Sequence, residues 1–176
     1  MGDVRGAIAI LGLTACGRIE FAPLDDAGRD VAVDMMSLEC VPPPCAGAAT
    51  ARLCGDRCFA ACAEIVMAVD SAPRCTAWGG TLAVMRYQAD VDCVTGLSSS
   101  QLWMGYFQIV NAATPAAGWS WVDGDPSTFV NWAAGEPNDG ATVESNTEQC
   151  GELYPDGSWN DEACGLFGED GFACSR

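Results

Sequence analysis

Eleven cysteines in a chain of 176 residues constrain its fold more than any other feature. So many cysteines in a short chain indicate an oxidising compartment and a framework of disulfides. Cys54, Cys58 and Cys62 recur every four residues, which on a helix would place three sulfurs on one face. Such a face could suggest a soft-metal or iron–sulfur site. We expect disulfides instead, because the chain has the cysteine content of an exported protein and lacks histidine.

The charge balance excludes several classes of function. The chain carries 24 acidic and 8 basic side chains, a formal net charge of −16, and it contains neither lysine nor histidine. Nucleic acid is not expected as a partner, because phosphate binding needs a basic surface. The missing histidine also excludes Ser-His-Asp chemistry and histidine-ligated zinc.

The first residues have the pattern of a targeting segment. Arg5 precedes a mainly apolar run over residues 6–13, which is too short to span a bilayer as a helix. The sequence LTAC, ending at Cys16, resembles the lipobox of bacterial lipoproteins, whose cysteine becomes the lipidated N-terminus. We expect a signal peptide over residues 1–15 and lipidation of Cys16, which leaves ten cysteines for pairing. The alternatives are a buried strand or a secretory signal cleaved near Ala15.

A stretch of scattered acids separates this segment from the remaining cysteines. Residues 16–39 show neither a strand nor a helix period. We expect a flexible acidic tether that joins a lipid anchor to a domain over residues 40–176, on the outer membrane or cell surface. The alternative is a short surface helix over residues 31–38.

Oxygen-bearing side chains gather between residues 132 and 164. They fall in three groups, around Pro137, before Cys150 and after Trp159: Glu136, Asn138, Glu148, Asn160 and Asp161. Carboxylate and carboxamide oxygens are the ligands that a hard cation such as calcium prefers. Carboxylates brought together without a cation would repel one another and raise their pKa values. We therefore interpret this stretch as a calcium site.

The order of these motifs resembles the sugar-binding half of the C-type lectin domain. Glu-Pro-Asn, a glutamate two residues before a cysteine, Trp-Asn-Asp and a further cysteine follow one another as in that family. The resemblance implies that one calcium ion is held by five residues: Glu136, Asn138, Glu148, Asn160 and Asp161. It also implies a cis peptide bond before Pro137, since X–Pro is the only bond where cis is cheap.

The resemblance extends over residues 45–176. Cys75 is followed by Gly79-Gly80 and Leu82-Ala83 with the family's spacing and residue types. Trp103-Met104-Gly105-Tyr106 is similar to the family's Trp-Ile-Gly-Leu core strand. The other tryptophans near the loops match framework positions, so we expect them to pack in the core.

Two helices are expected before and after the paired glycines. Helical spacing covers residues 64–75, where Pro73 should end or distort the helix, and the second helix falls at residues 88–97. Asp156-Gly157 predicts a tight hairpin that presents Asn160 and Asp161 on its returning strand. The resulting fold class is α+β: a C-type lectin-like double-loop fold with two helices, small antiparallel sheets and disulfides.

The resemblance also implies part of the disulfide framework. It pairs Cys75 with Cys174, and it places Cys58 in a cysteine-closed hairpin with Cys45 as the expected partner. Cys150 and Cys164 bracket the last ligand group and could close that loop. Pairing among the remaining cysteines stays open: Cys40, Cys54, Cys62 and Cys93.

The implied function is calcium-dependent binding of glycans or glycoconjugates. In the family, Glu-Pro-Asn order marks a preference for the vicinal hydroxyls of mannose-type sugars, which Glu136, Asn138, Glu148 and Asn160 would contact. The alternative is a lectin-like module that binds protein, with structural calcium or none. A glycosidase using paired carboxylates such as Glu136 and Asp161 is disfavoured, because calcium would neutralise both. We therefore expect no enzymatic activity.

Two departures from the family pattern concern the same loop. The insertion over residues 140–145 lengthens it, so that Glu144 competes with Glu148 as the ligand. A second calcium ion would draw on Asp139, but Gln149 stands where an acid is usual. We expect one calcium ion.

Overall fold

The computed structural model describes residues 39–166 and 171–176. The predicted signal peptide, Cys16 and all of the predicted tether except Glu39 lie outside these residues. From Glu39 onward the chain forms a single compact unit. Neither of its helices has the length and apolar character needed to cross a bilayer, a finding restricted to the described residues.

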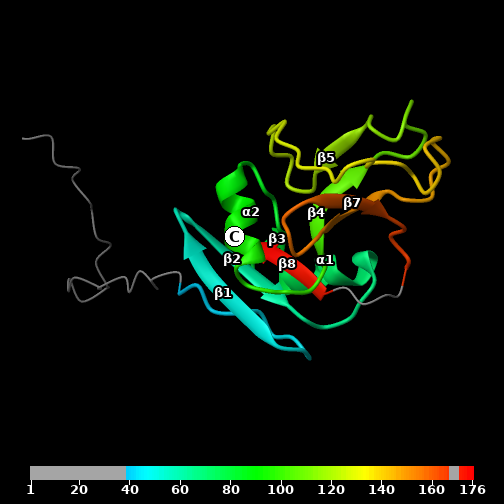
Figure 1. The fold of residues 1–176 in the computed structure, drawn as a ribbon. Helices are drawn as coiled ribbons and strands as arrows, with labels where there is room; N and C mark the ends of the chain where they lie inside the picture. Colours follow the sequence, from blue (N-terminus) through cyan, green and yellow to red (C-terminus); the bar gives the residue numbers. More distant parts are fainter. Residues whose placement is uncertain (1–38, 167–170) are drawn as a thin grey trace, which may run out of the picture. The chain divides into compact units, whose positions relative to one another are not determined.

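One mixed sheet organises the domain (Figure 1). Its path runs β1-β2-β8-β4-β6-β7, while β3 pairs with β8 and β5 with β4. Neighbouring strands are antiparallel except β4 and β8, so the expected small antiparallel sheets are joined into one. The strands are β1 (Ala49–Cys54), β2 (Arg57–Cys62), β3 (Thr81–Leu82), β4 (Leu102–Gln108), β5 (Trp119–Trp121), β6 (Cys150–Leu153), β7 (Trp159–Glu162) and β8 (Gly171–Ser175).

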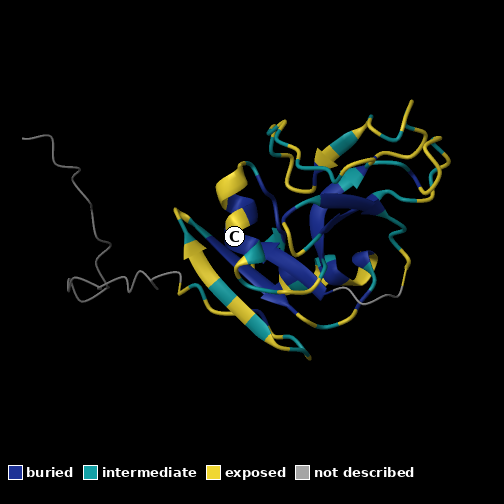
Figure 2. Ribbon diagram, in the orientation of Figure 1, coloured by how far each residue is buried: buried dark blue, intermediate teal, exposed yellow. Residues whose placement is uncertain are grey.

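The central strands are apolar on both faces, because each face of the sheet carries one helix. Along β2, Phe59 and Ala61 pack in the cluster that includes residues of α2 (Gln88–Thr95). The alternate residues, such as Ala60, pack in a second cluster with α1 (Ala68–Ala77). Figure 2 accordingly shows β2, β4 and β8 as mostly buried and β1 as largely exposed at the edge. The expected α+β class with two helices is confirmed.

The first helix differs from its expected bounds. It begins at Ala68, after Met67, and continues through Pro73 to Ala77. A proline inside a helix removes one backbone hydrogen bond, which normally favours an earlier end. Here the buried residues Ser71 and Cys75 hold the helix against the sheet on both sides of Pro73. Tertiary packing therefore outweighs the local preference.

Five disulfides join all ten cysteines of the described residues. Cys75–Cys174 and Cys150–Cys164 are the pairs stated from the sequence. The expected Cys45–Cys58 pair is wrong. The remaining bonds are Cys40–Cys58, Cys45–Cys62 and Cys54–Cys93.

The wrong pairing came from the resemblance, which implied one hairpin disulfide, whereas this segment carries two cysteines that each reach β2. Cys58 and Cys62 lie on one face of β2, because side chains four apart on a strand point the same way. The segment that carries Cys40 and Cys45 follows this face, so each of its cysteines meets a different one. Cys54 lies on neighbouring β1 and reaches α2 instead.

Four indole rings surround Tyr106 where the loops leave the sheet. Their centroids lie between 4.4 and 5.9 Å from the Tyr106 ring: Trp119, Trp121, Trp132 and Trp159. Trp121 and Trp159 are 3% and 0% exposed, as expected for framework positions, whereas Trp119 and Trp132 are half-buried and pack against the edge of the core. These rings form the base on which the long loops between β4 and β6 rest.

Candidate functional site

The β6–β7 hairpin positions one side of the candidate site. Gly157, at φ 90°, closes its turn, and the Gly157 amide donates to the Tyr154 carbonyl at 2.9 Å. This register places Asn160 opposite Glu152 and Asp161 opposite Gly151. The hairpin predicted from Asp156-Gly157 is therefore present, with the Trp-Asn-Asp motif on its returning strand.

Asp161 fastens the Glu-Pro-Asn loop to β7. Its carboxylate is 1% exposed, and it accepts hydrogen bonds from the backbone amides of Asn138 at 2.9 Å and Asp139 at 2.7 Å. The Glu136–Pro137 peptide bond is cis, as the sequence implied, and the Asn138 amide donates to the Glu136 carboxylate. Three of the predicted ligands thus meet at one point, from two separate segments.

Asn160 is held by a partner that the sequence did not indicate. Its side-chain Nδ2 lies 3.3 Å from Oε2 of Glu152, which is 2% exposed. Because the nitrogen faces Glu152, the Oδ1 atom is the one that Asn160 can offer to a cation. Glu152 therefore fixes which end of this carboxamide is available.

The carboxylates of this region affect one another's protonation. Burial, and then the charges of Glu162 and Asp161, raise the pKa of Glu148 to about 7. Burial and the charge of Asp161 also raise the pKa of Glu136, although a hydrogen bond from Asn138 opposes them. The part of each shift that comes from neighbouring charges is the repulsion expected where carboxylates gather without a cation.

Glu144 has a different position from Glu148. Its carboxylate accepts hydrogen bonds from the Gln108 side chain and the Asn146 amide, both at 3.0 Å. It thereby ties the inserted loop to the end of β4. Glu148, in contrast, lies close enough to Asp161 for the charge of Asp161 to raise its pKa.

Asp139 lies beside these residues but is surrounded by donors. Its carboxylate is 1% exposed and accepts hydrogen bonds from backbone amides of Ser145, Thr147 and Glu148. Burial alone would raise the pKa of Asp139, but these bonds, together with the Ser145 hydroxyl, hold it well below its usual range. Asp139 is therefore a fixed anion inside the loop.

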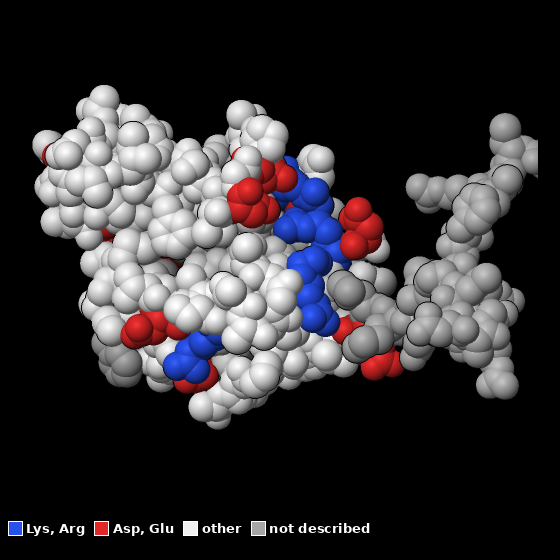
Figure 3. All heavy atoms as spheres, turned by 180° about the vertical axis from the view of Figure 1, so that it is seen from behind, with Lys and Arg blue, Asp and Glu red and all other residues white. Residues whose placement is uncertain are grey.

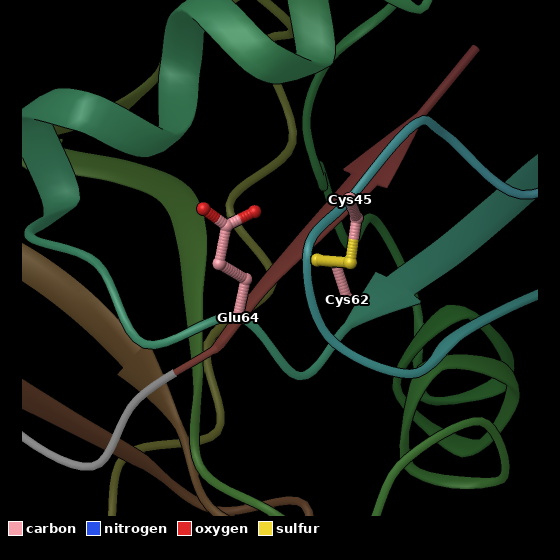
Figure 4. A group of neighbouring side chains, drawn as sticks. All are labelled: Cys45, Cys62 and Glu64. Carbon is pink, nitrogen blue, oxygen red and sulfur yellow. A yellow bond between two sulfur atoms is a disulfide. The ribbon is translucent and has the colours of Figure 1, made fainter.

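A second cluster has the residue types of a metal site, but its sulfur atoms cannot act as metal ligands. Cys45, Cys62 and Glu64 bring ligand atoms within 4.8 Å of one another, the only such acid or cysteine triplet among the described residues (Figure 4). The two sulfurs are joined as a disulfide and have no thiolate to offer. Glu64 accepts from the Ala46 amide and pairs with Arg74. The cluster is structural.

Basic side chains and a separate cavity also lie outside the predicted ligand set. Arginines form a column bordered by acids on the face shown in Figure 3. Arg57 and Arg86 both pair with Asp90. A cavity of about 590 Å³ is lined by Arg86, Tyr87 and residues 125–129, and by none of the five predicted ligands. Neither feature changes the location of the candidate site.

Comparison with known proteins gives the family. Residues 67–176 match the family model described as the lectin C-type domain. The chain belongs to the C-type lectin domain family. Pulmonary surfactant-associated protein D of Sus scrofa is 32% identical to this C-type lectin over 96 residues. That match covers 54% of the chain and 25% of the relative, so the chain spans about a quarter of that protein's length.

Solved structures show the same fold at low sequence identity. The carbohydrate-recognition domain of cow CD23, solved in the presence of the oligosaccharide GlcNAc2Man3, has a TM-score of 0.58 at 23% identity. That likeness covers 76% of this C-type lectin and 96% of the CD23 chain. A calcium-independent type II antifreeze protein has a TM-score of 0.62 at 23% identity, covering 74% and 97%. The same fold therefore occurs in a protein that is calcium-independent.

Sequence reasoning on this C-type lectin missed two acids beside the site. Glu152 and Glu162 lie on β6 and β7, and the register pairs them with Asn160 and Cys150 respectively. The predicted turn at Asp156 could have predicted both pairs, because residues equally far from a hairpin turn face each other across it. That register would have placed Glu152 beside a predicted ligand.

Proposed function

We propose that this C-type lectin domain binds carbohydrates through one calcium ion and prefers mannose-type sugars. The proposed ligands of the ion are those stated from the sequence: Glu136, Asn138, Glu148, Asn160 and Asp161. The supporting observation is the contact between Asp161 and the backbone of Asn138 and Asp139, which brings the Glu-Pro-Asn loop onto β7. The proposed activity is binding, without a catalytic step.

The donor set fits calcium. Three carboxylates and two carboxamides supply only oxygens, the preference of a hard cation. Burial raises the pKa values of Glu136 and Glu148, and the charge of Asp161 raises both further, as expected for acids that lie near one another without a cation. The Nδ2 atoms of Asn138 and Asn160 already donate to glutamates, so the Oδ1 atom of each side chain is the one available to the ion.

The same side chains can recognise a sugar. When bound, calcium supplies open coordination positions for two neighbouring hydroxyls. Carboxylate oxygens of Glu136 and Glu148 accept hydrogen bonds from those hydroxyls, while the amide groups of Asn138 and Asn160 donate to them. The order of acceptor and donor around the ion then selects the hydroxyl geometry. Glu-Pro-Asn order supports the mannose-type assignment.

A site that contacts one sugar through two hydroxyls binds it weakly, so display of many copies matters. Lipidation at Cys16, with residues 16–39 as tether, would anchor the domain to a membrane and present it many times. Multivalent attachment raises avidity without new contacts, provided that the tether reaches. The proposed partners are therefore glycans or glycoconjugates on another surface.

The decisive experiment is retention on mannose-coated beads with calcium and with a chelator. We expect retention with calcium, release by chelator, and weaker retention on galactose beads. Retention that survives the chelator would contradict the role of calcium and favour the protein-binding or calcium-independent alternative.

The specificity is tested by a double variant, Glu136→Gln with Asn138→Asp. It reverses the donor and acceptor order on the two sides of Pro137, so preference should move towards galactose-type sugars. The measurement compares retention on mannose and galactose beads for a variant that still binds calcium. An unchanged sugar profile would overturn this account of specificity.

A further inference from the structure

The inserted loop closes around an internal carboxylate. The Asp139 Oδ2 atom accepts from the backbone amide and hydroxyl of Ser145, the hydroxyl at 2.6 Å. Its Oδ1 atom accepts from the amides of Thr147 at 2.8 Å and Glu148 at 2.7 Å, and the Thr147 hydroxyl lies 3.1 Å away. Three backbone amides and two hydroxyls therefore converge on one buried anion.

These contacts hold a backbone that would not adopt this path by itself. Asp139, Thr142 and Asn146 have φ values of 50°, 66° and 60°. Residues other than glycine occupy this left-handed region only at a cost, which is greatest for a β-branched residue such as Thr142. Hydrogen bonds to an ionised carboxylate are stronger than those between neutral groups, so they can offset that cost.

The loop path decides where Glu148 lies. Its amide is bonded to Asp139, and its Oε1 atom would lie 3.2 Å from a Cβ built on Gly140. A hydrogen bond from the Gly140 backbone also acts on the Glu148 carboxylate. Both ends of Glu148 are thus fixed by residues 139–140.

We propose that Asp139 is a positioning residue whose carboxylate holds residues 140–148 in place without any ion and excludes a second cation from the loop. A cation beside Asp139 would face the hydrogen atoms of three backbone amides and the Ser145 hydroxyl, whose dipoles favour an anion at that point. The fixed loop presents Glu148 to the single calcium ion. This last step rests on the proposed calcium site.

The first test uses the unaltered, calcium-free domain. Hydrogen exchange measured by NMR should show the amides of Ser145, Thr147 and Glu148 slowed by about a hundredfold or more relative to an unstructured chain. Unprotected amides in the calcium-free domain would overturn the proposal. Calorimetric titration should show one calcium ion per chain, and two ions would also overturn it.

The second test is Asp139→Asn, with Asp156→Asn as its matched control. Asp156 also accepts from a serine amide and hydroxyl, those of Ser158 at 2.9 and 2.6 Å, but it lies exposed in the β6–β7 turn. In Asp139→Asn the three amides should exchange at least about tenfold faster and calcium affinity should fall by about tenfold, because charge-assisted hydrogen bonds are lost. Asp156→Asn should change neither quantity by more than about twofold.

The outcomes separate this proposal from the calcium site itself. Equal calcium affinity in Asp139→Asn and the unaltered domain would overturn the positioning role. Protected amides in a domain that binds no calcium would support the ion-independent loop and overturn the proposed function. If Asp139→Asn does not fold, Ser145→Ala removes one hydroxyl donor and should show the same two changes to a smaller extent. Unchanged exchange in Ser145→Ala would then count against the proposal.

Discussion

The disulfide-linked sheet and the long loops between β4 and β6 are stabilised by different forces. All five disulfides involve cysteines outside residues 94–149, a stretch in which the sequence has no cysteine. The sheet buries apolar side chains on both faces, whereas the loops are largely exposed or half-buried (Figure 2). The loops are held by hydrogen bonds onto the carboxylates of Asp139, Glu144 and Asp161.

This difference determines what each region responds to. Disulfides and apolar burial are nearly indifferent to calcium and to pH between about 5 and 8. Contacts made by carboxylates change when those groups gain a proton or an ion. The same domain should therefore contain one region that ions and protons barely affect and another that they control.

The largest expected effect is on the sheet, in the double variant Cys75→Ala with Cys174→Ala. This disulfide spans 99 residues, so its loss should lower the free energy of unfolding by about 4 kcal/mol. Urea unfolding measures that change. Calcium-dependent sugar binding under native conditions should persist, because the loop contacts are separate from this bond. A folded variant that had lost sugar binding would break the distinction between the two regions.

A smaller effect is expected in the loops, from Glu148→Gln. Neutralising one partner of a partly buried charge pair should reduce calcium affinity by about a hundredfold while leaving the urea midpoint nearly unchanged. Glu144→Gln is the control, because Glu144 contacts Gln108 rather than the ligand group. Its calcium affinity should stay within about threefold of the unaltered domain. The reverse ranking by calorimetry would assign the ligand to Glu144.

The smallest effect is the pH dependence of stability without calcium, because Glu148 is partly exposed and solvent screens its charge, and this effect best separates the two regions. The pKa of Glu148 is raised from 4.5 to about 7 in the folded domain. A carboxyl group whose pKa is higher when folded stabilises the fold below its unfolded pKa, and this contribution is lost as pH rises through the folded value. The calcium-free domain should therefore lose stability between about pH 4.5 and 7.

Calcium should reverse this trend, because the ion favours the charged form. Below about pH 7 the ion must displace a proton, so calcium affinity should fall by up to about tenfold per pH unit. No histidine is present to produce a competing transition in this range. The pKa of Asp139 is lowered, so the contribution of this group to stability changes only below the ordinary aspartate pKa of 3.8. Thermal unfolding with and without calcium at pH 5 and pH 8 measures how the stabilisation by calcium depends on pH. This pH dependence should disappear in Glu148→Gln.

The parts of the fold that could be predicted are those encoded by short-range signals. Asp156-Gly157 specified the β6–β7 hairpin, and the resemblance carried by the motif order implied the cis bond before Pro137. The partner that the resemblance implied for Cys45 was wrong, and the four-residue cysteine repeat could not correct it, because that repeat is compatible with one face of a helix or of a strand. Only the strand β2, set by its pairing with β1 and β8, decides between these alternatives.

The role of Asp139 was hidden for a different reason. Its donors come from a loop whose path depends on left-handed residues such as Thr142, for which the sequence carries no turn signal. A carboxylate in the sequence can equally be a metal ligand or the centre of a ring of amides. Only the three-dimensional path of residues 140–148 distinguishes the two.

The indole rings around Tyr106 give this domain a built-in optical reporter. Trp132 lies four residues before Glu136, and its ring is 5.8 Å from that of Trp159, directly before Asn160. Close aromatic rings in a fixed arrangement give near-UV circular dichroism, which disappears when packing becomes fluid. Any movement of the ligand loops that reaches Trp132 should therefore alter this spectrum. Ligand binding could then be followed without attaching a dye.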